Sequence, residues 1–249
     1  MQVWSGIGRA LGRTVADLLF PPVCSACGVA VDQPAGVCPT CWSSLRFLER
    51  PYCDILCLPF PYDQPDQTVS PEAIADPPDF QRLRSVVLYD EKARRLVSAL
   101  KYHDRLDLVP LMASWMVRAG REVLEDADLI VPVPLHRRRL LHRQFNQSAE
   151  LARRIARLNG KDYGPTALVR KKATVSQVGL KRNQRRDNVK GVFETPPAAR
   201  DLVRGRSILL VDDVFTTGAT VGSATKALKR AGAGSVAVLT FARVAAFEG

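Results

Sequence analysis

An apolar segment that ends in two adjacent aspartates places the strongest constraint on how this chain can fold. Residues 207–211 read Ser-Ile-Leu-Leu-Val, which is typical of a strand buried on both faces. Asp212 and Asp213 follow directly, and residues 216–220 (Thr-Thr-Gly-Ala-Thr) then open a segment with helical spacing. A buried strand that turns into a helix is the repeating unit of α/β folds, so this pattern predicts a mainly parallel sheet.

The chain after residue 80 repeats this alternation of short apolar runs and amphipathic segments. Further strands are expected at residues 84–89, 128–133 and 235–242. Helices are expected at residues 91–102, 109–124, 147–159 and 220–231. The fold class is therefore α/β, with helices on both faces of the sheet, and we see no internal repeat in the chain.

The turn after residues 207–211 has the composition of a sugar-phosphate site. A helix N-terminus offers unpaired N–H groups and a positive dipole end, both of which suit a phosphate. Carboxylates accept hydrogen bonds from paired hydroxyls, so Asp212 and Asp213 suit a ligand that also carries a diol. The simpler alternative is a helix cap and an ordinary turn, which would need fewer acidic and hydroxyl groups than this segment has.

The positive charge of the chain is concentrated in one region. The formal net charge is +11, and residues 136–206 carry 19 Lys and Arg against five Asp and Glu. A local positive field suits a polyanion such as a nucleotide or nucleic acid, and a solvated basic face is the alternative. Pro134 and Leu135 lie in a proline-constrained turn before Arg137, and a rigid turn beside arginines suits a pyrophosphate.

All six cysteines lie between residues 24 and 57. Two Cys-x-x-Cys pairs, separated by ten residues, have the spacing of a structural zinc site, and four buried free thiols are the alternative. The expected ligands are Cys24, Cys27, Cys38 and Cys41. Four thiolates fill a tetrahedron, which leaves no open position for catalysis. Cys53 and Cys57 have a different spacing and are left outside this site, either as part of another tetrad or as packing residues.

The strand, the two acids and the small-residue loop resemble the 5-phosphoribosyl-1-pyrophosphate (PRPP) motif of type I phosphoribosyltransferases. The resemblance implies that Asp212 and Asp213 contact the ribose hydroxyls, and that Mg²⁺ accompanies the pyrophosphate. It assigns phosphate binding to the loop and its flanking residue. These residues are Val214, Thr216, Thr217, Gly218, Ala219 and Thr220.

Further motifs narrow the resemblance to the ComF family, in which a zinc finger precedes a phosphoribosyltransferase domain. Residues 132–135 read Pro-Val-Pro-Leu, and residues 143–147 read Arg-Gln-Phe-Asn-Gln, with Gln144 where the family has glycine. Residues 169–193 match the family's spacing of Arg, Thr, Gln, Asn and Phe. In phosphoribosyltransferases a mobile loop closes over PRPP, so the resemblance assigns Arg185 to the departing pyrophosphate. Arg137 and Arg143 are expected to bind the substrate.

Two other family positions differ in this chain. The family usually has a third Cys-x-x-Cys followed by glycine, where this chain has Cys53 and Cys57. Lys101 and Tyr102 match a family Lys-Tyr/Phe-x-Gly string, with His103-Asp104 in place of the glycine, and a basic helix terminus is the favoured interpretation of Lys101.

The resemblance divides the chain into three parts. Residues 1–58 are expected to hold an N-terminal helix and the four-cysteine zinc finger, residues 59–79 a proline-rich linker, and residues 80–249 the phosphoribosyltransferase-like domain. We find no membrane span and no secretory leader in the sequence, so we expect a cytoplasmic protein.

Two functions remain as hypotheses. The first is a PRPP-dependent, Mg²⁺-assisted phosphoribosyltransferase whose acceptor the sequence does not identify, linked to DNA uptake or nucleotide metabolism. The second is a non-catalytic competence protein that binds single-stranded DNA through the basic region, Trp42 and Phe145, and uses the phosphate loop as a nucleotide sensor. Expected partners are PRPP or a related sugar phosphate, single-stranded DNA and proteins of DNA uptake.

Overall fold

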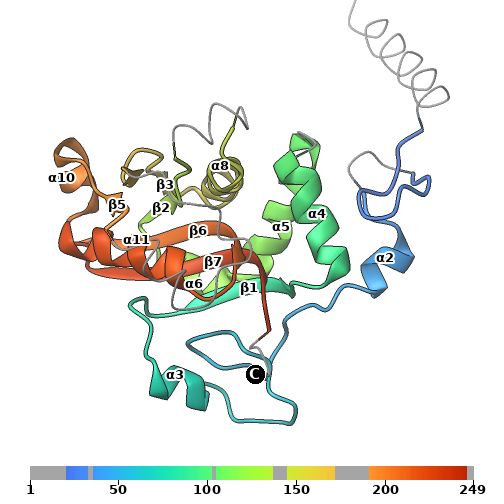
Figure 1. Cartoon of the computed structure of the whole chain (residues 1–249), viewed down its shortest axis with the longest axis horizontal. Coiled ribbons are helices and arrows are strands. Elements are labelled where there is room, and N and C mark those ends of the chain that lie inside the picture. The colour runs from blue at the N-terminus through green and yellow to red at the C-terminus, as the bar shows by residue number, and fades with distance from the viewer. Residues whose placement is uncertain (1–20, 33–35, 103–104, 137–144, 172–190, 246–249) are drawn as a thin grey trace, which may run out of the picture.

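A fully parallel five-stranded sheet forms the centre of the computed structural model (Figure 1). The structure describes residues 21–32, 36–102, 105–136, 145–171 and 191–245. The strand order is β1 (Leu83–Leu88), β7 (Ser235–Arg243), β6 (Ser207–Phe215), β2 (Leu129–Pro132) and β3 (Asp162–Tyr163). The predicted α/β class is confirmed, and the predicted helix at the N-terminus lies outside the described residues.

Both faces of the sheet are buried, because successive apolar residues of the strands point to opposite sides. On β6, Leu209 and Val211 belong to the core beneath helices α4, α5 and α8, whereas Ile208 and Leu210 belong to the core beneath α11. The covering helices are α4 (Glu91–Tyr102), α5 (Val109–Ala119), α8 (Gln147–Asn159) and α11 (Ala219–Arg230). Two cores on one sheet explain why the strands read as continuous apolar runs.

Strand β6 is longer than predicted. It continues beyond Val211 to Phe215 because its parallel pairing with β7 persists to the register Phe215↔Arg243. Asp212 and Asp213 therefore lie on the strand itself and are fixed by the sheet.

The predicted helix 109–124 is divided at Gly120 into α5 and α6 (Arg121–Glu125). A Cβ atom at Gly120 would lie 2.7 Å from a methyl group of Leu239, so the close approach of helix and sheet requires glycine there. Short elements that the sequence did not predict complete the domain. They are η1 (Leu106–Leu108), β4 (Val169–Arg170), β5 (Phe193–Glu194), η2 (Pro197–Ala199) and α10 (Arg200–Val203).

The N-terminal part contains a tight turn at the first cysteine pair. The N–H of Cys24 donates to Val29 O at 2.7 Å, and the N–H of Gly28 donates to Cys24 O at 2.8 Å. Gly28 has a φ of +79°, and Val23 pairs with Ala30 across the turn. The turn is followed by the short helix α2 (Pro39–Ser43).

The same turn recurs at Cys53. The N–H of Cys53 donates to Leu58 O at 2.7 Å, and the N–H of Cys57 donates to Cys53 O at 2.8 Å. Cys57 has a φ of +53°, Tyr52 pairs with Pro59, and the short helix α3 (Pro71–Ala75) follows. We expected no internal repeat, but the backbone geometry of the two turns repeats. The sequence does not reveal this repetition, because the two turns share few side chains.

Aromatic residues attach the first cysteine turn to the sheet. The ring of Trp42 in α2 lies 4.7 Å from those of Phe47 and of Trp115 in α5, and Trp115 stacks on Phe241 of β7. Trp42 was a candidate for stacking on DNA bases, and the structure shows that part of its surface is used in this internal contact.

Within the described part of the chain, no helix combines the length and hydropathy that a membrane crossing requires. The division at residues 58 and 79 stays a prediction, and the second cysteine turn with α3 runs across the first of these boundaries.

Candidate functional site

The predicted sugar-phosphate residues gather at the carboxyl edge of the sheet. Strand β6 supplies Asp212 and Asp213, the loop after it leads into α11, and α8 begins beside the end of β2. Helix α4 contributes Lys101 from its last turn. Ligands of open α/β sheets bind at this edge, because strand ends and helix N-termini meet there.

Asp212 is held by hydroxyl and backbone donors. Ser148, at the start of α8, donates its hydroxyl to Asp212 Oδ1 at 2.9 Å, and the N–H of Asp213 donates to the same oxygen at 2.9 Å. Burial, reinforced by the neighbouring charge of Asp213, raises the pKa of Asp212 to about 7. The carboxyl group is therefore poised to change its charge near neutral pH.

Asp213 has a different partner. Its carboxylate forms a buried ion pair with Lys101, whose Nζ lies 2.8 Å away. Burial alone would lower the pKa of Lys101, but the charges of Asp213 and Asp212 raise it above its ordinary value. The interpretation of Lys101 as a basic helix terminus missed this contact, because α4 and β6 are far apart in sequence.

The loop between β6 and α11 has donors available for a ligand. Gly218 has a φ of +76°, and a Cβ atom there would lie 3.0 Å from the Phe215 ring, so glycine is required. No side chain of the described residues caps the N-terminus of α11. The Thr217 hydroxyl is buried and has no hydrogen-bond partner among the described residues. Because Thr217 lies in the loop at this edge of the sheet, its hydroxyl is placed to donate to a ligand there.

The proline turn after β2 is tied to helix α8. The N–H of Val133 donates to Val211 O at 2.9 Å, and the Asn146 side-chain amide donates to Val133 O at 3.0 Å. The side-chain oxygen of Asn146, Oδ1, caps α8 by accepting a hydrogen bond from the N–H of Ser148 at 3.2 Å. Pro134 and Leu135 continue from this turn and are partly exposed. Asn146 and Ser148 were not predicted as residues that position the site, although an Asn directly before a helix is a recognisable cap.

Three predicted arginines lie outside the described residues. They are Arg137, Arg143 and Arg185. Arg185 belongs to the predicted mobile loop, and the strands on either side of that loop are described. They are β4 and β5, which pair antiparallel with Val169 opposite Glu194 and Arg170 opposite Phe193.

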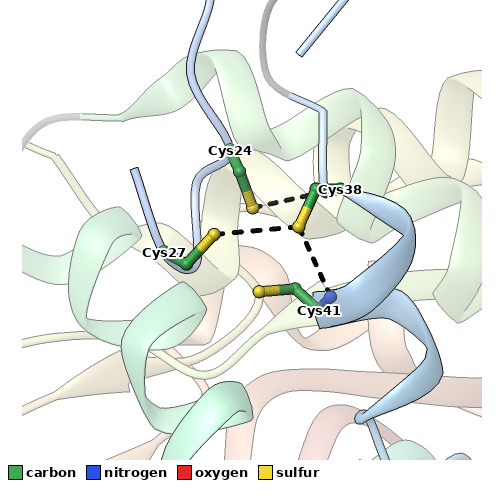
Figure 2. Close-up of side chains that lie close together, drawn as sticks. All are labelled: Cys24, Cys27, Cys38 and Cys41. Carbon is green, nitrogen blue, oxygen red and sulfur yellow. Dashed lines mark hydrogen bonds between the residues drawn. The ribbon is translucent and has the colours of Figure 1, made fainter. Parts of the chain in front are cut away.

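Four cysteine thiols converge in the N-terminal part (Figure 2). The sulfur atoms of Cys24, Cys27, Cys38 and Cys41 all lie within 4.8 Å of one another, and the Cys27–Cys38 separation is 3.7 Å. Tetrahedral Zn–S bonds of about 2.3 Å place the sulfur atoms about 3.8 Å apart. The predicted cluster is confirmed, and its donor set fits a closed structural zinc site.

The thiols of this cluster cannot all ionise without a cation. Burial opposes ionisation of Cys24, but N–H donors led by that of Cys38, at 3.3 Å, lower the pKa of Cys24 to about 6. Burial and the three neighbouring cysteines raise the pKa of Cys41 to about 12. A divalent cation held by all four thiolates would offset two of their four negative charges and so favour the ionised cluster.

Cys53 and Cys57 are buried away from this cluster. The Cys53 sulfur accepts hydrogen bonds from the N–H groups of Ser70 at 3.2 Å and Leu56 at 3.4 Å. Among the residues with assigned positions, only the first four cysteines form a group of potential metal ligands.

Known proteins resemble both parts of the chain. Residues 15–72 match the double zinc ribbon domain, and residues 148–247 match the phosphoribosyl transferase domain. The DNA utilization protein YhgH of Salmonella typhimurium is 32% identical over 228 residues, which cover 89% of this chain and 90% of that protein. The chain belongs to the ComF/YhgH family.

Other members of the ComF/YhgH family are more distant. Competence protein F of Haemophilus influenzae is 28% identical over 171 residues, 67% of this chain and 74% of that protein. Competence protein ComFC of Bacillus subtilis is 28% identical over 162 residues, 64% of this chain and 63% of that protein. The family resemblance read from the sequence is thus confirmed, as is a phosphoribosyltransferase-like domain behind a zinc ribbon.

Proposed function

We propose that the carboxyl edge of the sheet binds PRPP with Mg²⁺. The observation that carries this proposal is the buried Thr217 hydroxyl beside the N-terminus of α11, since within the described parts of the chain the hydroxyl has no partner and the helix no side-chain cap. A phosphate would accept from this hydroxyl and from the first N–H groups of the helix, and the helix dipole favours its negative charge. Asp212 and Asp213, on the preceding strand, would accept from the ribose hydroxyls.

A substitution of Thr217 tests the proposal directly. Thr217→Val keeps the shape of the side chain and removes only the hydroxyl. A hydrogen bond to a charged group contributes about 1.5–3 kcal/mol, so we expect PRPP affinity in Mg²⁺, measured by calorimetry, to fall at least tenfold.

Thr225, inside the helix that follows the loop, offers a matched control. Its hydroxyl is also buried and has no partner among the described residues, but it lies two turns further along α11. Thr225→Val should leave PRPP affinity unchanged. Equal affinities in both variants, or no binding of PRPP to the unaltered protein at millimolar concentration, would show that the proposal is wrong.

As part of this proposal, the bound PRPP transfers its 5-phosphoribosyl group to an acceptor. The acceptor forms a bond to ribose C1 while the bond to pyrophosphate breaks, and pyrophosphate leaves with the electron pair. Arg185, with Arg137 and Arg143, is proposed to stabilise the departing charge. Release of pyrophosphate from PRPP, measured with a panel of bases, amines and single-stranded DNA, would identify the acceptor. We propose that the reaction takes place in the cytoplasm.

The relatives named for DNA utilization and competence favour a second function, binding of single-stranded DNA. The basic region of residues 136–206 is its candidate surface, and backbone contacts make such binding weaken steeply with salt. If the PRPP and DNA sites are separate, Asp212→Asn with Asp213→Asn abolishes PRPP binding and leaves DNA affinity unchanged. Equal loss of both would place the two ligands in one site.

A further inference from the structure

The resemblance between the two cysteine turns extends to the helices that follow them. In the first unit, Cys38 is the N-cap of α2, its sulfur accepts from the N–H of Cys41 at 3.4 Å, and Pro39 follows it. The N–H of Cys38 donates to the sulfur of Cys24 at 3.3 Å, which connects the helix to the turn.

The second unit has the same contacts with different side chains. Ser70 is the N-cap of α3, its hydroxyl accepts from the N–H of Ala73 at 3.4 Å, and Pro71 follows it. The N–H of Ser70 donates to the sulfur of Cys53 at 3.2 Å. Ser70 therefore occupies the position of Cys38, and Ala73 that of Cys41.

These shared contacts establish which residues occupy the four ligand positions in the second unit. Cys53 corresponds to Cys24, since both sulfur atoms accept from the helix cap and both N–H groups close the turn. Leu56 stands at the position of Cys27, and Cys57 stands where the first unit has Gly28. The four ligand positions are thus Cys53, Leu56, Ser70 and Ala73, of which one is a cysteine.

An apolar core occupies the place of the metal. Cys53 and Ala73 are buried in one hydrophobic cluster, and Leu56 packs against it. Structural zinc requires four donors, which this set does not supply. Among the described residues, no third Cys, His, Asp or Glu forms a compact group of ligand atoms with Cys53 and Cys57.

Two buried arginines of the sheet hold the second unit from outside. Arg84 of β1 donates to the backbone O of Asp54 at 2.7 Å and to its carboxylate at 2.9 Å. Arg243 of β7 donates to the backbone O of Leu56. Both contacts fall within the second cysteine turn, so they fix its backbone where a metal would otherwise do so.

We propose that residues 51–75 are a second ribbon that has lost its metal site, so that the protein binds one zinc ion. The second ribbon keeps its fold through the Cys53 cluster and the two arginines. The match to a double zinc ribbon then describes two ribbons of which only the first, at Cys24, binds metal.

Zinc content of the purified full-length protein tests the proposal, with equivalent substitutions in the two ribbons. We expect one zinc ion per chain by elemental analysis, less than a tenth of this in Cys24→Ala, and an unchanged value in Cys53→Ala. Two zinc ions per chain, or loss of zinc from folded Cys53→Ala, would overturn the proposal.

Restoration of the ligands tests the correspondence of positions. A variant with Leu56→Cys, Ser70→Cys and Ala73→Cys should bind a second zinc ion, and Co²⁺ should give twice the thiolate charge-transfer absorbance of the unaltered protein. A folded variant that still binds one ion would contradict the assignment. If this variant does not fold, the comparison of Cys24→Ala with Cys53→Ala still decides between one site and two.

Discussion

At the scale of single residues, the two adjacent aspartates differ because they contact different elements. Asp213 is paired with the cation Lys101, whereas the donors to Asp212 among the described residues are the Ser148 hydroxyl and a backbone N–H. Burial beside a second carboxylate therefore leaves Asp212 with the raised pKa of about 7. Such a group lowers the stability of the folded protein when it ionises and is typical of a ligand site.

This difference predicts how stability depends on pH. The folded protein retains a proton on Asp212 that the unfolded chain releases near pH 4, so the free energy of unfolding should fall as pH rises from about 4 to about 7. Asp212→Asn cannot ionise and should be about 1–3 kcal/mol more stable than the unaltered protein at pH 8. This difference should shrink steadily as the pH is lowered from 8 to 4, as measured by urea unfolding.

An exposed carboxylate provides the control for this prediction. Asp201 in α10 is 94% exposed in its side chain, so Asp201→Asn should change stability little at either pH. A lower stability of Asp212→Asn at pH 8 would contradict the assigned pKa.

At the scale of elements, a buried arginine joins the second ribbon to the sheet. Arg84 on β1 is fully buried and also pairs with Glu122 of α6 at 2.7 Å, so it connects the ribbon, the sheet and a helix. Removing one partner of a buried ion pair leaves the other charge without compensation.

Replacement of Arg84 should therefore be costly. Arg84→Met is expected to lower the free energy of unfolding by about 3 kcal/mol, because Asp54 and Glu122 lose their buried partner and keep only the more exposed Arg50 and Arg82. Arg82 binds the same Asp54 at 3.1 Å with a side chain that is 39% exposed, so Arg82→Met should cost less than about 1 kcal/mol. Similar losses in both variants, measured by denaturant unfolding, would contradict the role of burial.

At the scale of the whole molecule, zinc should determine how the first ribbon packs on the sheet. The contact consists of Trp42, Phe47, Trp115 and Phe241, and α2 carries both Trp42 and a cysteine ligand. Loss of zinc removes the constraint that holds α2, because structural zinc supplies folding energy to modules of this size.

Chelation should accordingly change the tryptophan signals of the folded protein. We expect the near-UV circular dichroism of the Trp42–Trp115 pair to fall and tryptophan emission to shift to longer wavelength, with recovery on return of Zn²⁺. Far-UV signal from the sheet should persist, since most residues of its two cores belong to the strands and their covering helices, although Cys24, Cys38 and Cys41 are part of the first core. Trp42→Phe should lack the chelation response, and an unchanged near-UV signal in the unaltered protein would refute this coupling.

The sequence by itself determined the α/β class, the four-cysteine cluster and the edge of the sheet that carries the candidate site. These features depend on local patterns: apolar runs, close cysteine pairs, and acids followed by Thr-Thr-Gly-Ala-Thr. Helices 91–102 and 147–159 were predicted with the bounds that the structure has, because their periodicity and caps lie within the segments themselves.

Only the tertiary structure decided which residues meet across long stretches of chain. Lys101 reaches Asp213, and Ser148 reaches Asp212, through contacts that no local spacing specifies. Strand β6 extends past Val211 because β7 supplies the pairing. In the second ribbon the sequence showed only the altered cysteine pair, Cys53 and Cys57. Its full extent was not evident because main-chain hydrogen bonds, which do not require particular side chains, keep its geometry although three of the four ligand positions hold other residues.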